Sequence, residues 1–156
     1  MMDRNMLYQN SSKELTFARN CQALISQKEF EIRIMDINNQ YSPYNLNNYL
    51  SNMQKQTVQL KIDELKNKRN NHIINAIDYA LQLADRELNE HVVFAMASIA
   101  ISSINSFLAV YQIHTVSLPR ELGNKLETIY RKLVSYNNTL LQTGVMKLKE
   151  YDEKRL

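Results

Sequence analysis

Residues 91–115 of this 156-residue chain read HVVFAMASIAISSINSFLAVYQIHT and contain no Asp, Glu, Lys or Arg. Apolar residues recur here at helical spacing, in one register that runs from Val93 to Tyr111 and in a second that begins at Val92. A helix that is apolar around most of its circumference is covered by neighbouring helices or by lipid. The stretch therefore predicts the central helix of the fold, which the rest of the chain must be arranged to cover.

The cover of this helix is expected to be protein and not a bilayer. Its length is borderline for a membrane span, which needs roughly 20 mainly apolar residues. Several serines and Asn105 dilute the apolar run, and in lipid each of these polar groups needs a partner. Neither end carries a Lys/Arg cluster or a Trp belt, as spans usually do. We therefore expect no membrane span.

The composition favours a single all-helical domain. Two Gly and two Pro are few for this length, whereas strand-rich folds need many turns. The only cysteine, Cys21, fits a reducing compartment, and the N-terminus has no apolar leader, so we expect a cytoplasmic protein. The net charge of +3 is too small to argue for a nucleic-acid partner.

The helical patterns predict an antiparallel four-helix-type bundle. Core helices are expected over residues 58–88, 91–114 and 120–142, and a fourth is expected from the tail. The third of these has the most regular seam, in which apolar residues alternate in steps of four and three: Leu122, Leu126, Ile129, Leu133, Tyr136 and Leu140. Such a seam suits near-antiparallel packing of helices. The bundle core then covers residues 58–156 of one domain.

Residues 1–57 are predicted to form an extension that packs alongside the bundle. Within it, the run EFEIRI at residues 29–34 alternates polar and apolar side chains, which is the pattern of a half-buried strand. The only partner for such a strand is the β-branched stretch at residues 115–118. The segment at 29–35 is therefore either a short β element or the end of a helix.

Few residues offer catalytic chemistry. The three histidines lie on different segments and no Cys, Asp or Glu stands at metal-ligand spacing from them, so we expect neither a metal nor a cofactor. One pair is a candidate for catalysis: Arg86 and His91 are separated by four residues at the junction of two middle helices. All-helical ribonucleases of the HEPN class use such a pair, with the His as acid and base and the Arg on the phosphate. This pair defines the enzymatic alternative.

Two stretches resemble the flagellin export chaperone family known as FliS. AMASIAISSINSFL at residues 95–108 is similar to the second core helix of that family, and ELGNKLETIYRKLVSYN at residues 121–137 is similar to its third. AIDYA at residues 76–80 echoes its first helix, so that the resemblance covers about residues 58–156. The family's N-terminal Tyr-Asn arm and its Ser-Pro-x-x-Leu start are not present as such.

The resemblance implies a binding protein without enzymatic activity, either a chaperone or a co-chaperone of flagellar protein export. Its partner would be flagellin, the flagellin chaperone itself or another export substrate. A bundle can hold an amphipathic helix of such a partner in a groove between its own helices. The contact is expected beside the last core helix, at Ile129, Tyr130, Leu133 and Tyr136. A structural subunit of a larger complex is the third alternative.

Overall fold

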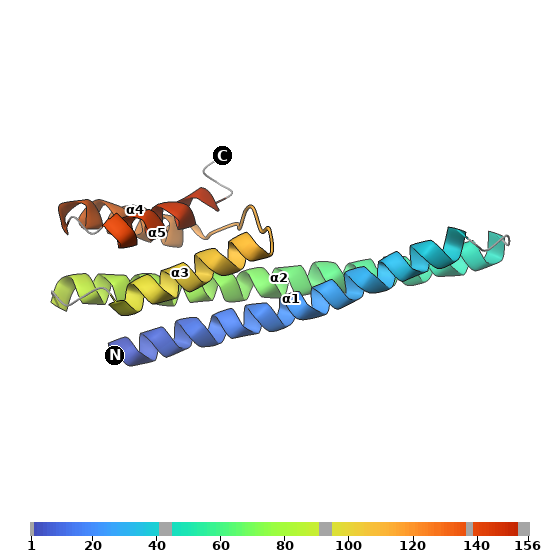
Figure 1. Cartoon of the computed structure of the whole chain (residues 1–156), viewed down its shortest axis with the longest axis horizontal. Coiled ribbons are helices and arrows are strands. Elements are labelled where there is room, and N and C mark those ends of the chain that lie inside the picture. The colour runs from blue at the N-terminus through green and yellow to red at the C-terminus, as the bar shows by residue number, and fades with distance from the viewer. Residues whose placement is uncertain (1, 41–44, 91–94, 137–138, 153–156) are drawn as a thin grey trace. The chain divides into compact units, whose positions relative to one another are not determined.

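A computed structural model describes residues 2–40, 45–90, 95–136 and 139–152. These residues form five helices in the order α1 (Arg4–Gln40), α2 (Asn45–Glu90), α3 (Ala95–Val110), α4 (Arg120–Tyr136) and α5 (Thr139–Glu150) (Figure 1). The described part of the chain has no strand, apart from one isolated bridge between Val116 and Asp152. The expected all-α fold is confirmed.

The chain divides into two compact units. The first combines residues 1–16 with residues 72–156, and the second comprises residues 17–71. The division falls within α1 and α2, so each of these helices contributes a part to each unit. This organisation differs from the expected extension over 1–57 and core over 58–156, because the first turns of α1 belong with the C-terminal helices.

The start of α1 is held in the first unit by buried contacts with α2. Leu7 and Leu15 are buried, and the hydroxyl of Ser11 donates a hydrogen bond to the backbone carbonyl of Ala76 at 2.9 Å. One turn further along, Glu14 Oε2 lies 2.6 Å from His72 Nδ1. A buried hydroxyl needs such a partner, since leaving it unsatisfied costs about 1–3 kcal/mol. These contacts explain why residues 1–16 pack with the bundle.

The C-terminal helices of the first unit alternate in direction. Ion pairs join Lys125 to Asp78 and Lys132 to Asp85, so α4 runs parallel to α2. Lys149 near the end of α5 pairs with Glu127 in the middle of α4. Gly123 near the start of α4 lies close to Asp152, just beyond α5, so these two helices are antiparallel (Figure 1). The predicted seam of α4 is confirmed at the four positions that the structure buries, Leu122, Leu126, Ile129 and Leu133. The expected helix over 120–142 is instead two helices, since α4 ends at Tyr136 and α5 begins at Thr139.

A capping motif ends α3. Gln112 has a φ of 53°, and around it Ile113 N–H donates to the carbonyl of Leu108 at 2.9 Å. Gln112 N–H donates to the carbonyl of Ala109, which completes a Schellman arrangement. Both Leu108 and Ile113 are buried, as the hydrophobic contact of that motif requires. The helix expected over 91–114 therefore stops at Val110, and its first residues, 91–94, lie outside the described residues.

The second unit is a pair of helices with a thin core. Ile25 of α1 packs with Ile62 and Leu65 of α2, and Ile32 and Val58 lie against this cluster. An ion pair of 2.7 Å between Lys55 and Asp36 also joins the two helices. The pairing is antiparallel, because residues later in α1 meet residues earlier in α2.

Of the two alternatives for residues 29–35, the structure shows the helix and not the short β element, because α1 continues through this segment to Gln40. The alternation of Phe30, Ile32 and Ile34 does not follow burial. Ile32 lies against the core cluster, whereas Phe30 and Ile34 are exposed. Apolar side chains on the outside of the helix thus produced a strand-like pattern in the sequence.

Candidate partner-binding surface

One face of α3 is buried and the opposite face is open. The buried side chains are Ala97, Ala100, Ile101, Ile104, Phe107 and Leu108. The exposed side chains are Ile99, Ser102, Ser106, Ala109 and Val110. The first register of the central stretch is thus confirmed as core from Ala97 to Phe107. The second is not, because Ile99 is 52% exposed and Met96 is half-buried.

The open face of α3 carries no charge, and this distinguishes it from α4. α3 contains no Asp, Glu, Lys or Arg, while the exposed side of α4 carries Lys125, Arg131 and Lys132. Val110 is 71% exposed at the end of the same face. An amphipathic surface helix normally places charged residues on its outer side. The outer side of α3 instead carries uncharged side chains, most of them small.

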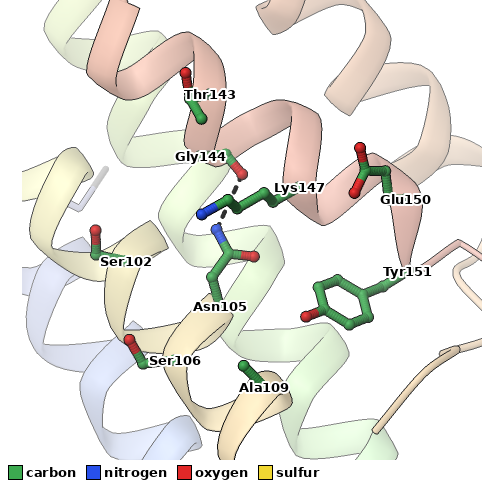
Figure 2. Close-up of a pocket in the computed structure, with 9 residues that line it drawn as sticks. All are labelled: Ser102, Asn105, Ser106, Ala109, Thr143, Gly144, Lys147, Glu150 and Tyr151. Carbon is green, nitrogen blue, oxygen red and sulfur yellow. Dashed lines mark hydrogen bonds between the residues drawn. The ribbon is translucent and has the colours of Figure 1, made fainter. Parts of the chain in front are cut away.

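A groove of about 440 Å³ lies between this face and α5 (Figure 2). Its α3 wall consists of Ser102, Asn105, Ser106 and Ala109, and its other wall consists of Thr143, Gly144, Lys147, Glu150 and Tyr151. The α3 wall has mostly small side chains, whereas the longer side chains, Lys147, Glu150 and Tyr151, come from the other wall. Figure 2 shows the hydroxyl of Tyr151 directed toward α3.

Asn105 and Gly144 hold the two walls of the groove together. Asn105 Nδ2 donates a hydrogen bond to the carbonyl of Gly144 at 3.0 Å (Figure 2). A Cβ atom at position 144 would lie 2.9 Å from Cγ2 of Ile101, which is closer than packed carbon atoms approach. Glycine therefore allows the backbone of α5 to lie against α3. The hydrogen bond and this close approach fix the base of the groove, and its other side is open.

The residues predicted for partner binding on α4 divide into core and surface. Ile129 and Leu133 are buried in the bundle. Tyr130 is half-buried, with Lys149 Nζ over its ring at 4.7 Å from the centroid. Tyr136 is 47% exposed at the end of α4. In this structure, Tyr130 and Tyr136 are thus the two members of the predicted set that reach the surface.

Ile129 also lines a second hollow, of about 510 Å³, between α2 and α4. Leu81 lies on the α2 side of it, and the ion pair between Lys132 and Asp85 stands at its edge. The hollow is therefore bordered by paired charges. The groove beside α3 has no comparable ion pair among the residues that line it in the described part of the chain.

The Arg86 of the candidate nuclease pair is engaged within the fold. Its Nε donates to Glu90 Oε1 at 2.6 Å, and its Nη1 donates to the carbonyl of Met2 at 2.8 Å. His91 lies outside the described residues. The structure thus places Arg86 in a contact between α2 and the N-terminal segment of the chain.

Two further properties concern only the described residues. No three His, Cys, Asp or Glu side chains among them converge as metal ligands would. None of the helices described combines the length and the hydropathy that a bilayer crossing requires.

Comparisons with protein-family models, with curated proteins and with solved structures give no match.

Sequence reasoning did not identify the groove beside α3. The run of uncharged residues predicts a helix that is buried on nearly all sides, whereas the structure buries only one face of α3. The information was present in Ser102 and Ser106, which stand four residues apart on the side away from Ile101 and Ile104. An uncharged helix with a small-residue face indicates either burial or a surface kept for a partner.

Proposed function

We propose that the chain is a non-enzymatic binding protein that takes up an amphipathic helix of a protein partner along the open face of α3. The single observation that supports this proposal most strongly is the uncharged exposed face from Ile99 to Val110 beside the groove with α5. Exposed apolar side chains that lie together on one surface are typical of interaction sites.

The dimensions of this face suit a helical partner. Ile99 and Val110 are eleven residues apart, which corresponds to about 16 Å along the helix axis. That length matches two to three turns of a partner, with anchors at positions i, i+4 and i+7. The small side chains of Ser102, Ser106 and Ala109 let a second helix axis approach to about 8–10 Å. Glu150 and Lys147 at the rim offer both signs of charge to polar residues of the partner.

The biological role we propose is that of a chaperone or co-chaperone of flagellar protein export, similar to FliS. Its support is the resemblance of residues 95–108 and 121–137 to that family. The first of these segments is the helix that carries the open face. By covering an apolar helix face of flagellin, of the flagellin chaperone or of another export substrate, the protein would keep that face from aggregating before assembly.

Binding to defined partners tests the proposal. The probes are fluorescently labelled FliS and a fluorescently labelled amphipathic helical peptide of flagellin, each titrated with the full chain in an anisotropy assay. The variant Ser106→Arg places a long charged side chain in the groove. We expect its dissociation constant to rise by at least about tenfold, which corresponds to about 1.4 kcal/mol.

The matched control is Ser12→Arg, which introduces the same side chain at an exposed serine of α1 and should leave the affinity unchanged. A third variant, Tyr136→Ala, tests the surface predicted at the end of α4. Loss of binding in Tyr136→Ala with normal binding in Ser106→Arg would move the site to α4. Absence of binding to either probe would contradict the export role.

A further inference from the structure

Glu87 of α2 is a fully buried carboxyl group within the first unit. Its exposed fraction is 0%, and among the residues that the structure describes neither Oε1 nor Oε2 has a hydrogen-bond partner. A buried carboxylate without partners is costly, because removing a charge from water costs several kcal/mol unless it is paired. Such a group either carries a proton or marks a place where the fold gives way when it ionises.

The Glu87 carboxyl faces the beginning of α3. The backbone N–H groups of Met96 and Ala97, in the first turn of that helix, lie toward it and lower its pKa, although neither completes a hydrogen bond. Among the described residues, the charged side chains that act on its pKa are Arg4 of α1, which lowers it, and Glu90 of α2, which raises it. Burial outweighs the attraction of Arg4 and of the helix, so that the pKa of Glu87 is raised above its ordinary value.

Arg4 is not dedicated to Glu87. Its Nε lies 3.2 Å from Glu90 Oε2, while Arg86 holds the other oxygen of Glu90 at 2.6 Å. Glu90 thus binds both arginines, and no ion pair to Glu87 is formed within the described part of the chain. Both arginines keep their charge over the whole range in which a carboxyl group titrates.

We propose that Glu87 is a proton-operated latch on α3: the neutral carboxyl lets the first turn of α3 pack against α2, and ionisation loosens that turn. The sign follows from linkage. The group prefers its protonated form in the folded state, so its contribution to stability is complete below its unfolded-state pKa. That contribution is lost as the pH rises through the folded-state pKa.

Two measurements on the full chain test the latch. The first is the titration of the Glu87 carboxyl carbon by NMR, which should have a midpoint above the ordinary value for glutamate. The second is amide hydrogen exchange in residues 96–110, corrected for the intrinsic pH dependence of exchange. Protection there should fall by at least about threefold between acidic and mildly alkaline pH.

The variant Glu87→Gln keeps the shape and removes the titration, so its protection should not depend on pH. Histidine side chains also change charge with pH, between about pH 5 and 8, and His91 lies four residues further along the chain. His91→Gln is therefore the control and should keep the pH dependence of the wild type. A Glu87 midpoint at or below the ordinary value would overturn the proposal, even if Glu87→Gln does not fold. Protection in the wild type that does not change with pH would overturn it as well.

Discussion

Arg69 of α2 donates a hydrogen bond from Nη1 to Gln22 Oε1 of α1 at 2.7 Å, and both side chains are buried in the second unit. Ile25, Ile62 and Leu65 form the apolar cluster of this pair of helices. A buried polar pair in an apolar seam favours one register of two helices, because sliding either helix would separate Arg69 Nη1 from its acceptor on Gln22. Burial lowers the pKa of Arg69, and the nearby Glu29 and Cys21 partly offset this effect.

The first prediction concerns this pair. Gln22→Ala removes the acceptor and leaves the Arg69 guanidinium buried with a donor unsatisfied. The free energy of unfolding should fall by about 1–3 kcal/mol. The double variant Gln22→Leu, Arg69→Leu should be close to the wild type or more stable, because an apolar pair needs no partner. Urea denaturation of these three chains measures the differences, and a Gln22→Ala variant as stable as the wild type would contradict the register role.

The second prediction concerns the thin core around Ile25. This side chain is fully buried, whereas the adjacent Leu24 is 47% exposed. Ile25→Ala should lower the free energy of unfolding by about 2–5 kcal/mol. Leu24→Ala deletes a side chain of similar size outside the core and should change it by no more than about 0.5 kcal/mol. Equal losses in the two variants, measured by denaturant titration, would show that the outer face of α1 is also covered in solution.

The helices of the first unit were easier to predict than those of the second. In α4, polar residues occupy most positions outside the buried seam, so the pattern reflects burial. The buried residues stand three or four positions apart: Leu122, Leu126, Ile129 and Leu133. In α1, Phe30 and Ile34 are apolar and exposed, and their alternation with charged residues imitates a strand. Local pattern cannot separate an apolar residue in the core from one on an open face.

The remaining features depend on contacts between residues that are far apart in the sequence, and local patterns do not predict such contacts. Nothing near Ser11 in the sequence indicates that its hydroxyl meets the carbonyl of Ala76 and ties the chain's start to the bundle. The uncharged stretch at 91–115 predicts a helix buried around most of its circumference, whereas α3 covers Ala95–Val110 and buries one face. Which side of it stays open depends on where α5 lies, and that is set by the close approach of Gly144 to Ile101.

The third prediction uses the two glycines. A methyl group at position 144 would meet Ile101 at 2.9 Å, whereas one at position 123 would meet the end of the Asp152 side chain at 3.3 Å. Gly144→Ala should therefore destabilise the fold by about 1–3 kcal/mol through overpacking. Gly123→Ala should stabilise α4 by about 0.5–1 kcal/mol, because alanine favours the helix. Thermal unfolding measures both, and an opposite order of the two variants would contradict the close approach of α5 to α3.

The fourth prediction concerns the pH dependence of Glu127. Lys149 hydrogen-bonds its Oε2, and Arg131 donates to its Oε1 at 3.2 Å. The bond from Lys149 is the main cause that lowers the pKa of Glu127 below its ordinary value. The ionised group's contribution to stability is therefore complete above the ordinary pKa and is lost as the pH falls through the lowered one. Carboxyl NMR should give a midpoint that rises in Lys149→Met.

The control for this titration is Lys132→Met, which removes a lysine of the same helix bundle that pairs with Asp85. It should leave the midpoint of Glu127 where it is in the wild type. A similar rise of the Glu127 midpoint in both variants would mean that the overall field of nearby positive charges lowers the pKa of Glu127, and not its specific bond with Lys149.

The most direct test of the proposed function is to observe the open face of α3 while a partner binds. An environment-sensitive fluorophore is attached at Ser106→Cys in a Cys21→Ser background, and FliS or the flagellin peptide is added. Covering the face predicts a blue shift and a rise in emission at position 106, with no change for the same probe at Ser12→Cys. Binding of the partner without any change at position 106 would contradict the account.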